Sequence, residues 1–218
     1  MPERKATFMI NFEEMKREKQ EAYHREAEDL YERLFEFVER DLNMREKVRA
    51  KHMFRDLCGF ETDRVLTHEE ELHAEHWMLF DYITVIGSRP FDLFIRSHSA
   101  ELTAKMKEIA GMMMLMHLAP YRVLHTCGTE HLLSPFQEER EIAVRAVGSP
   151  QQAEAGELIL ARVAQVGFEK TMIGPCIRIN PDDEEKALEK LRYFEAKGRK
   201  SYHRFLKETG ISFLQYRP

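Results

Sequence analysis

The chain has 218 residues, of which 43% are hydrophobic and 33% are charged, and its formal net charge is −5. These values are typical of a globular protein that is long enough to bury a core. The negative charge excludes a general affinity for polyanions, so a nucleic-acid site would have to be a local basic patch.

The sequence predicts a cytoplasmic protein that does not enter a membrane. Its amino-terminal residues are charged from Glu3 onward and contain no apolar core of a secretory signal. The most apolar run, residues 109–119, is too short to span a bilayer. Three cysteines, Cys58, Cys127 and Cys176, are scattered along the chain, as expected for reduced thiols.

The first half of the chain has the periodicity of helices. Residues 11–42 contain few helix breakers, and apolar side chains recur every three or four residues from Tyr23 to Leu42. Before Tyr23 this apolar stripe is weak, so we expect the first turns to project from the body of the protein or to fray. Four further helices are expected over residues 44–58, 67–84, 90–97 and 99–117.

After Pro120 the pattern changes to short segments rich in β-branched residues and separated by turns. We expect these segments to form a small antiparallel β sheet or barrel of about five strands. The expected strands are residues 121–125, 132–134, 141–147, 158–166 and 172–179. A helix is expected to follow from Pro181, and the tail is expected to form a short helix and then an extended end.

The predicted fold class is therefore α+β, with a helical N-terminal half, a small sheet and C-terminal helices. We divide the chain into charged N-terminal helices (residues 1–60), a helical domain (61–119), a small β module (120–180) and a C-terminal helix with its tail (181–218).

The stretch THEEELHAEHWMLFDY, residues 67–82, concentrates acids and histidines on one predicted helix. On that helix Glu69, His73 and His76 lie within about 60° of one another, an arrangement that suits zinc or iron. The alternative interpretation is that His76, which falls in the apolar stripe, is a core residue bonded to a neighbour. We favour packing and expect no cofactor, because a metal site also needs ligands from elsewhere; zinc remains the alternative.

The end of this helix and the GSRPFDLFIRSHS that follows resemble an uncharacterised bacterial family. In that family a helix with W-x-x-F-D-Y ends at a short loop, which is followed by a short helix that begins at proline and then by a small β module. The resemblance covers about residues 67–192. Members of the family often carry an SEC-C motif, a zinc-binding tail that is absent here. Arg89 stands where the family usually has threonine, and no activity comes with the resemblance. The matching residues are Trp77, Phe80, Asp81, Tyr82, Gly87, Pro90 and Phe94.

Asp81 lies near the C-terminal end of an apolar helix, where the helix dipole disfavours an anion. Such a carboxylate needs a partner, and we expect it to bond to the segment 88–92, which includes Arg89 and the start of the next helix. A role as general acid or base is the alternative.

The segment KGRKSYHRFLK, residues 197–207, is the strongest basic patch. Its mixture of cations and aromatic rings could bind single-stranded nucleic acid, although a solvated helix face anchored by aromatics has the same pattern. The candidate nucleic-acid ligands are Arg199, Lys200, Tyr202, Arg204 and Lys207.

The sequence gives little support to catalysis, since it contains no glycine-rich phosphate loop and no G-x-S-x-G motif. We therefore expect a non-catalytic interaction or regulatory protein, with the long N-terminal helix serving self-association or the docking of a protein partner. A nucleic-acid-associated protein and a metal-dependent enzyme are the two alternatives.

Overall fold

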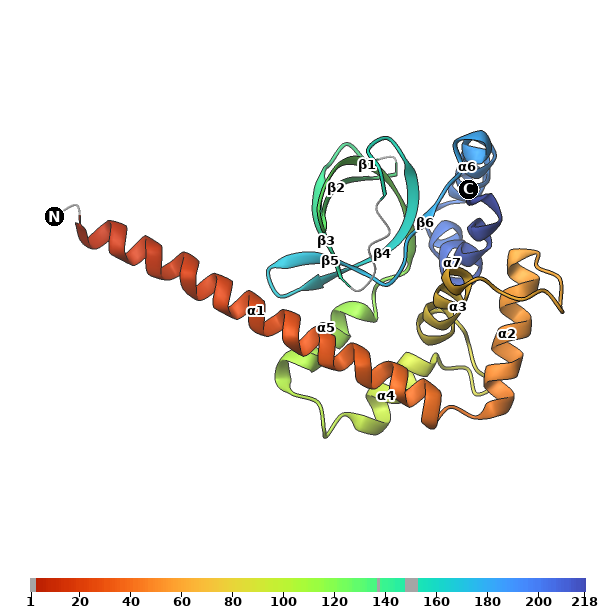
Figure 1. Ribbon diagram of the computed structural model, residues 1–218, viewed down its shortest axis with the longest axis horizontal. Coiled ribbons are helices and arrows are strands. Elements are labelled where there is room, and N and C mark those ends of the chain that lie inside the picture. The colour runs from red at the N-terminus through yellow and green to blue at the C-terminus, as the bar shows by residue number, and fades with distance from the viewer. Residues whose placement is uncertain (1–2, 137, 148–152) are drawn as a thin grey trace.

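The computed structural model describes residues 3–136, 138–147 and 153–218, and it confirms the α+β class. Helices form the N-terminal half and the C-terminal end, with a sheet between them (Figure 1). The elements in chain order are α1 (Glu3–Arg40), α2 (Met44–Cys58), α3 (His68–Phe80), α4 (Pro90–His98), α5 (Ala104–Met113), β1 (Leu118–Cys127), β2 (Glu130–Pro135), β3 (Ile142–Val147), β4 (Leu158–Val166), β5 (Glu169–Ile173), β6 (Ile177–Arg178), η1 (Pro181–Asp183), α6 (Glu184–Ala196), α7 (Arg199–Thr209) and η2 (Gly210–Tyr216).

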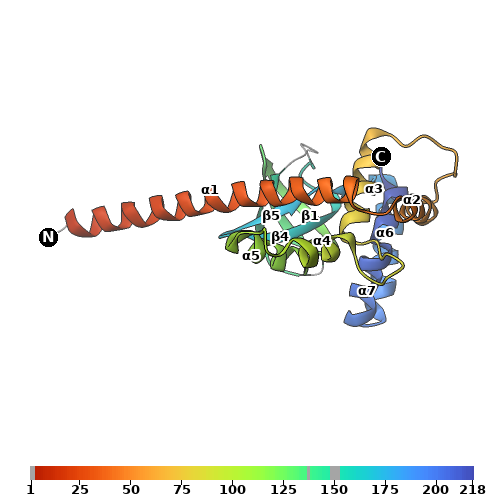
Figure 2. The same ribbon diagram turned by 90° about the horizontal axis from the view of Figure 1, so that it is seen from below.

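Helix α1 starts earlier than expected and extends beyond the rest of the molecule at its N-terminal end (Figures 1 and 2). Residues 12–19 are exposed, and Gln20 is the first buried residue among those whose side chains are described. The Gln20 amide donates to the Val166 carbonyl over 2.9 Å and accepts from the Phe168 N–H over 2.7 Å. The predicted projection of the first turns is therefore present, and α1 joins the body at Gln20.

Two helices are shorter than the sequence predicted. Local hydrogen bonds end α3 early and start α5 late. Helix α3 stops at Phe80, since the N–H groups of Asp81 and Tyr82 both donate to the Trp77 carbonyl over 2.9 Å. Helix α5 begins after Thr103, whose hydroxyl accepts from the Met106 N–H over 3.1 Å, and not after Ser99. Within the described residues, no helix is long and apolar enough to cross a bilayer.

The sheet closes on itself and is mixed, whereas an antiparallel sheet was expected. Strand β1 pairs with β2 and with β4, and the ring continues from β2 through β3 and β5 back to β4. The β3–β5 pair is parallel. The expected strand 172–179 is broken at Gly174 and Pro175, so that β6 pairs with β4 outside the ring.

Strand β4 separates the inside of the closed sheet from the helical layer. Ile159 and Ala161 belong to the apolar cluster inside the sheet, whereas Leu160 and Ala164 belong to the clusters that include the helices. Arg162 shares the outward face with these two, so it points from the sheet towards the helices. One of the clusters draws residues from all four predicted segments of the chain, and packing therefore crosses the boundaries between them.

The tail does not have the expected extended end. Residues Gly210–Tyr216 form the 3-10 helix η2, in which Ile211, Phe213 and Leu214 are buried. The Asn180 N–H donates to the Tyr216 carbonyl over 2.7 Å. The tail therefore contributes to the core that joins α2 to the C-terminal helices.

A buried ion pair joins the sheet to the helices. The Arg162 guanidinium donates to the Asp81 carboxylate, and the two side chains are 0% and 4% exposed. The remaining Arg162 groups, Nε and Nη1, have no hydrogen-bond partner within the described residues. Removing one member of such a pair leaves the other charged and desolvated.

The substitution Arg162→Met should therefore lower the free energy of unfolding by about 3–5 kcal/mol, because it leaves the Asp81 carboxylate without a cation. The measurement is urea denaturation at neutral pH. Adding Asp81→Asn should recover part of the loss, since the double variant no longer buries an unpaired charge. The control is Arg204→Met, which removes an exposed pair with Glu208 and should change stability by less than about 1 kcal/mol. Equal effects of the two arginine substitutions would contradict this role of Arg162.

Candidate functional site

The histidine-rich helix α3 places His76 in the core. Its ring is buried, Nδ1 donates to the Leu72 carbonyl over 2.6 Å, and Nε2 accepts from the Tyr31 hydroxyl. The ring also lies 5.0 Å from the Phe35 ring, measured between centroids. Burial lowers the pKa of His76 to about 4, which keeps the imidazole neutral. His76 therefore has the geometry of a packed histidine that is bonded to its neighbours.

The other two residues of the predicted metal site lie in different environments. His73 is buried and neither ring nitrogen has a hydrogen-bond partner in the described ranges, whereas Glu69 is exposed. Burial lowers the pKa of His73 to about 3, and the Arg162 charge acts in the same direction. No group of three or more His, Cys, Asp or Glu side chains in the described part of the chain is arranged to hold a metal ion. Zinc binding by Glu69, His73 and His76, the alternative to packing, stays a hypothesis.

Asp81 has a partner, as expected, but the partner was wrongly predicted. Its carboxylate pairs with Arg162 of β4, while Arg89 bonds to Asp92 over 2.8 Å and to the Phe80 carbonyl over 3.4 Å. Burial raises the pKa of the Asp81 carboxyl, and the positive charge of Arg162 opposes this shift. Sequence reasoning missed Arg162, although an arginine in the apolar strand LILARVAQV was a usable signal.

The other members of the W-x-x-F-D-Y segment are packing residues. Trp77, Phe80 and Pro90 are buried, and the Phe80 ring lies 5.5 Å from the Phe91 ring across the α3–α4 break. The segment thus fixes the angle between two helices, and its side chains are closed to solvent. A sealed cluster of this kind holds the fold together and gives no substrate access to Asp81.

The basic patch on α7 exposes its cations, but its aromatic rings do not face solvent as the sequence suggested. Arg199, Lys200 and Lys207 are exposed, but Arg204 pairs with Glu208 over 2.8 Å. The aromatic rings are turned inwards: Tyr202 is half-buried, and the buried Phe205 ring stacks on Phe194 with 3.7 Å between centroids. The patch therefore offers cations to solvent but little aromatic surface.

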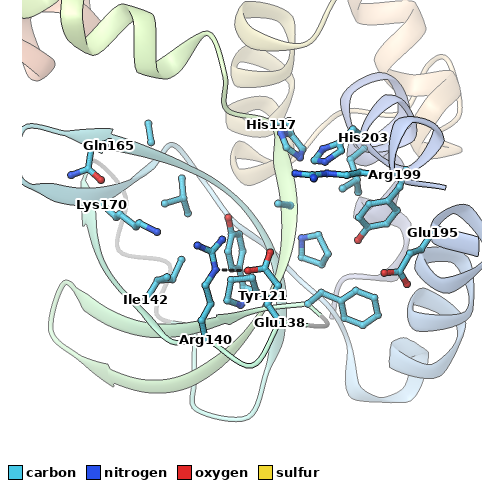
Figure 3. Close-up of a pocket in the computed structure, with 18 of the residues that line it drawn as sticks. His117, Tyr121, Glu138, Arg140, Ile142, Gln165, Lys170, Glu195, Arg199 and His203 are labelled. Atoms are coloured by element: carbon cyan, nitrogen blue, oxygen red, sulfur yellow. Dashed lines mark ion pairs between the residues drawn. The ribbon is translucent and has the colours of Figure 1, made fainter.

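The candidate binding site is a cavity of about 860 Å³ between the mouth of the closed sheet and α7 (Figure 3). The sheet contributes its inward-facing residues at this end, and the β2–β3 connection and α6 complete the rim. The side chains that line the cavity include Tyr121, Phe136, Glu138, Arg140, Ile142, Val163, Lys170, Glu195, Arg199, Tyr202 and His203.

The cavity combines cations with weakly basic and aromatic groups. Arg140 pairs with Glu138 at the rim, and burial raises the pKa of the neighbouring Tyr121 phenol to about 12. The His117 and His203 rings meet edge to face, 5.1 Å apart, and the Arg199 side chain points towards them (Figure 3). Burial and His203 lower the pKa of His117 to about 4. The lysine and arginine side chains that line the cavity are Arg140, Lys170 and Arg199.

Comparison with models of protein families, with curated proteins and with solved structures finds no match for this chain. The resemblance of residues 67–192 to a bacterial family stays a hypothesis.

The buried histidines should make the protein less stable in mild acid. In the unfolded chain each imidazole has its ordinary pKa of about 6.5 and takes up a proton below it, whereas folded His73 does not until about pH 3. Stability is therefore lost as the pH falls from about 7 to about 5, by roughly 2 kcal/mol at pH 5 for each such histidine. The substitution His73→Leu should reduce this slope and raise stability more at pH 5 than at pH 7.

Denaturation curves at several pH values test this expectation. The matched control is His52→Leu, which removes an exposed imidazole from α2 and leaves His73 in place, so the loss of stability attributed to His73 should persist. The same slope in the wild type and in His73→Leu would show that His73 is not a buried neutral base.

Proposed function

We propose that the protein is a non-catalytic interaction module, in which the N-terminal part of α1, residues 3–19, docks on a second copy of the chain. We call this segment the α1 arm. The observation that carries the proposal is that residues 12–19 are helical and exposed, ahead of the first body contact at Gln20.

Residues 12–19 of the α1 arm are helical although the body of the chain does not cover them. Most helices in proteins owe their stability to the packing of an apolar face, and short isolated helices are marginal in water. The α1 arm is roughly 25 Å long, yet the body of its own chain leaves its described side chains uncovered. A partner that covers one face would supply the missing packing.

The α1 arm has a sequence that suits such a partner. Phe12 and Met15 are three residues apart, which places them on one side of the helix. Phe12 and Met15 are 55% and 51% exposed. Charged residues such as Glu13, Glu14, Lys16 and Arg17 surround them. Apolar residues in line with mixed charges on both sides are typical of helices that pair with a similar helix.

The central cluster supports a role without catalysis. His73, His76 and Arg162 are each at most 2% exposed, so a substrate does not reach them in this conformation. A metal-dependent enzyme built on Glu69, His73 and His76 has the weakest support of the three functions, because the carboxylate and the imidazoles do not share one environment.

Deleting residues 1–19 should abolish self-association, because the deletion removes the α1 arm and leaves Gln20 in place. Light scattering coupled to gel filtration over a range of concentrations should show a dimer or higher state for the full chain and a monomer for the deletion. The double substitution Phe12→Gln and Met15→Gln should have the same effect with the helix retained. Val65→Gln, which changes an apolar residue 86% exposed and distant in sequence, is the control. A full chain that is monomeric at every concentration would refute the proposal.

A second candidate function is association with single-stranded nucleic acid through α7. The exposed side chains of Arg199, Lys200 and Lys207 favour it, whereas the inward position of Phe205 weakens the stacking that such proteins use.

Fluorescence anisotropy with a mixed-sequence oligonucleotide at low salt tests this candidate. If α7 binds the phosphate backbone, the double substitution Lys200→Met and Lys207→Met should weaken binding about uniformly across sequences and reduce its salt dependence. Lys107→Met, an exposed lysine on α5, should have no effect. The absence of any binding at low salt would remove this candidate.

A further inference from the structure

A lysine side chain, that of Lys170, lies at the mouth of the closed sheet. Lys170 pairs in register with Val144 of β3 and with Gln165 of β4. Val144 and Met172, two residues along β5, belong to the apolar cluster inside the sheet. Because alternate residues of a strand face the same side, Lys170 lies on the inward face, at one end of an interior that is mainly apolar and also contains His131.

Lys170 and Arg199 have no ion-pair partner among residues 3–136, 138–147 and 153–218. Lys170 is half-buried, and its side chain points into the cavity from β5, while that of Arg199 enters from α7 (Figure 3). Arg140 differs from both, because Glu138 neutralises it at the rim. Two cations from elements far apart in sequence thus face one cavity without forming an ion pair in the described part of the chain. Together with Arg140 they outnumber the two carboxylates that line it, Glu138 and Glu195. Such an arrangement favours an anion as the ligand.

The walls between the two cations are apolar and aromatic. Tyr121, Phe136, Ile142 and Val163 line the sheet side of the cavity. On the helical side, the Tyr202 hydroxyl is buried and has no hydrogen-bond partner in the described part of the chain. A buried hydroxyl without a partner is unfavourable, and a ligand whose polar atom reached it would supply the missing hydrogen bond.

We propose that this cavity binds a small organic anion that carries an aromatic ring. Lys170 and Arg199 contact the anionic group, the rings of Tyr121 and Phe136 contact the aromatic body, and the Tyr202 hydroxyl bonds to a polar atom of the ligand. The cavity volume of about 860 Å³ lies in the range of small-molecule sites, and a few placed polar groups in a mostly apolar wall are typical of them. A phosphate and a carboxylate share the required charge, so the experiment distinguishes them.

Isothermal titration of the full chain with four probes tests the proposal. AMP provides a ring with a phosphate, indole-3-carboxylate provides a ring with a carboxylate, and adenosine and inorganic phosphate each provide one half of the chemistry. At least one of the two ring-bearing anions should bind at least about tenfold more tightly than adenosine and than inorganic phosphate. The stronger of the first two identifies the anionic group.

Variants locate the binding. Lys170→Met and Arg199→Met should each weaken the preferred probe about tenfold, since each removes one charge-assisted contact. Tyr202→Phe should weaken it with no loss of thermal stability in the free protein, because its hydroxyl has no internal partner to lose. Lys107→Met, outside the cavity, is the matched control, and unchanged melting temperatures show that the variants are folded.

Three results would overturn the proposal. The first is that neither ring-bearing anion binds, and the second is that Lys170→Met and Arg199→Met bind as well as the wild type. The third is that an oligonucleotide binds and Lys200→Met weakens it as strongly as Lys170→Met, which would assign the cavity to nucleic acid. None of these outcomes depends on the α1 arm, which is tested separately.

Discussion

The relation between the sheet and the helices depends on the buried pair of Arg162 and Asp81. Taking two charges out of water is expensive, and only close pairing offsets that expense. Arg162 is placed by the outward face of β4, and Asp81 follows the last turn of α3, so the pair fixes one element against the other. A shift of β4 by one residue would turn Arg162 into the apolar interior of the sheet. The pair therefore disfavours a one-residue shift of β4.

Burial, together with the Arg162 charge, accounts for the neutral histidines beside the pair. Burial and the guanidinium charge both lower the pKa of His73, and the same two causes lower the pKa of His76. A protonated imidazole there would place a second positive charge next to Arg162 in a region with little water. The histidines that suggested chemistry in the sequence are thus kept in one charge state, as apolar packing requires.

This arrangement separates the centre of the molecule from its potential binding surfaces. The centre is closed, with its charges paired and its rings packed. The features that remain open are at the edges: the α1 arm extends past the body, and the cavity at the mouth of the sheet faces α7 (Figures 1 and 3). Both proposals therefore concern binding, since exposed helical surface and unpaired cations recognise partners without bond-breaking chemistry.

The sequence by itself determined the elements whose ends are set by neighbouring residues in the chain, such as helix caps and turns. Helix α2 and strand β4 have the predicted bounds, because Asn43 and Gly59 cap the helix, with Gly59 at φ 68°, and turns enclose the strand. The projection of the α1 arm also followed from its weak apolar stripe. Only the tertiary structure decided the partner of Asp81, the parallel β3–β5 pair, the burial of the tail and the position of Lys170 in the cavity. Asp81 and Arg162 are 81 residues apart, and strand register, not local pattern, brings such residues together.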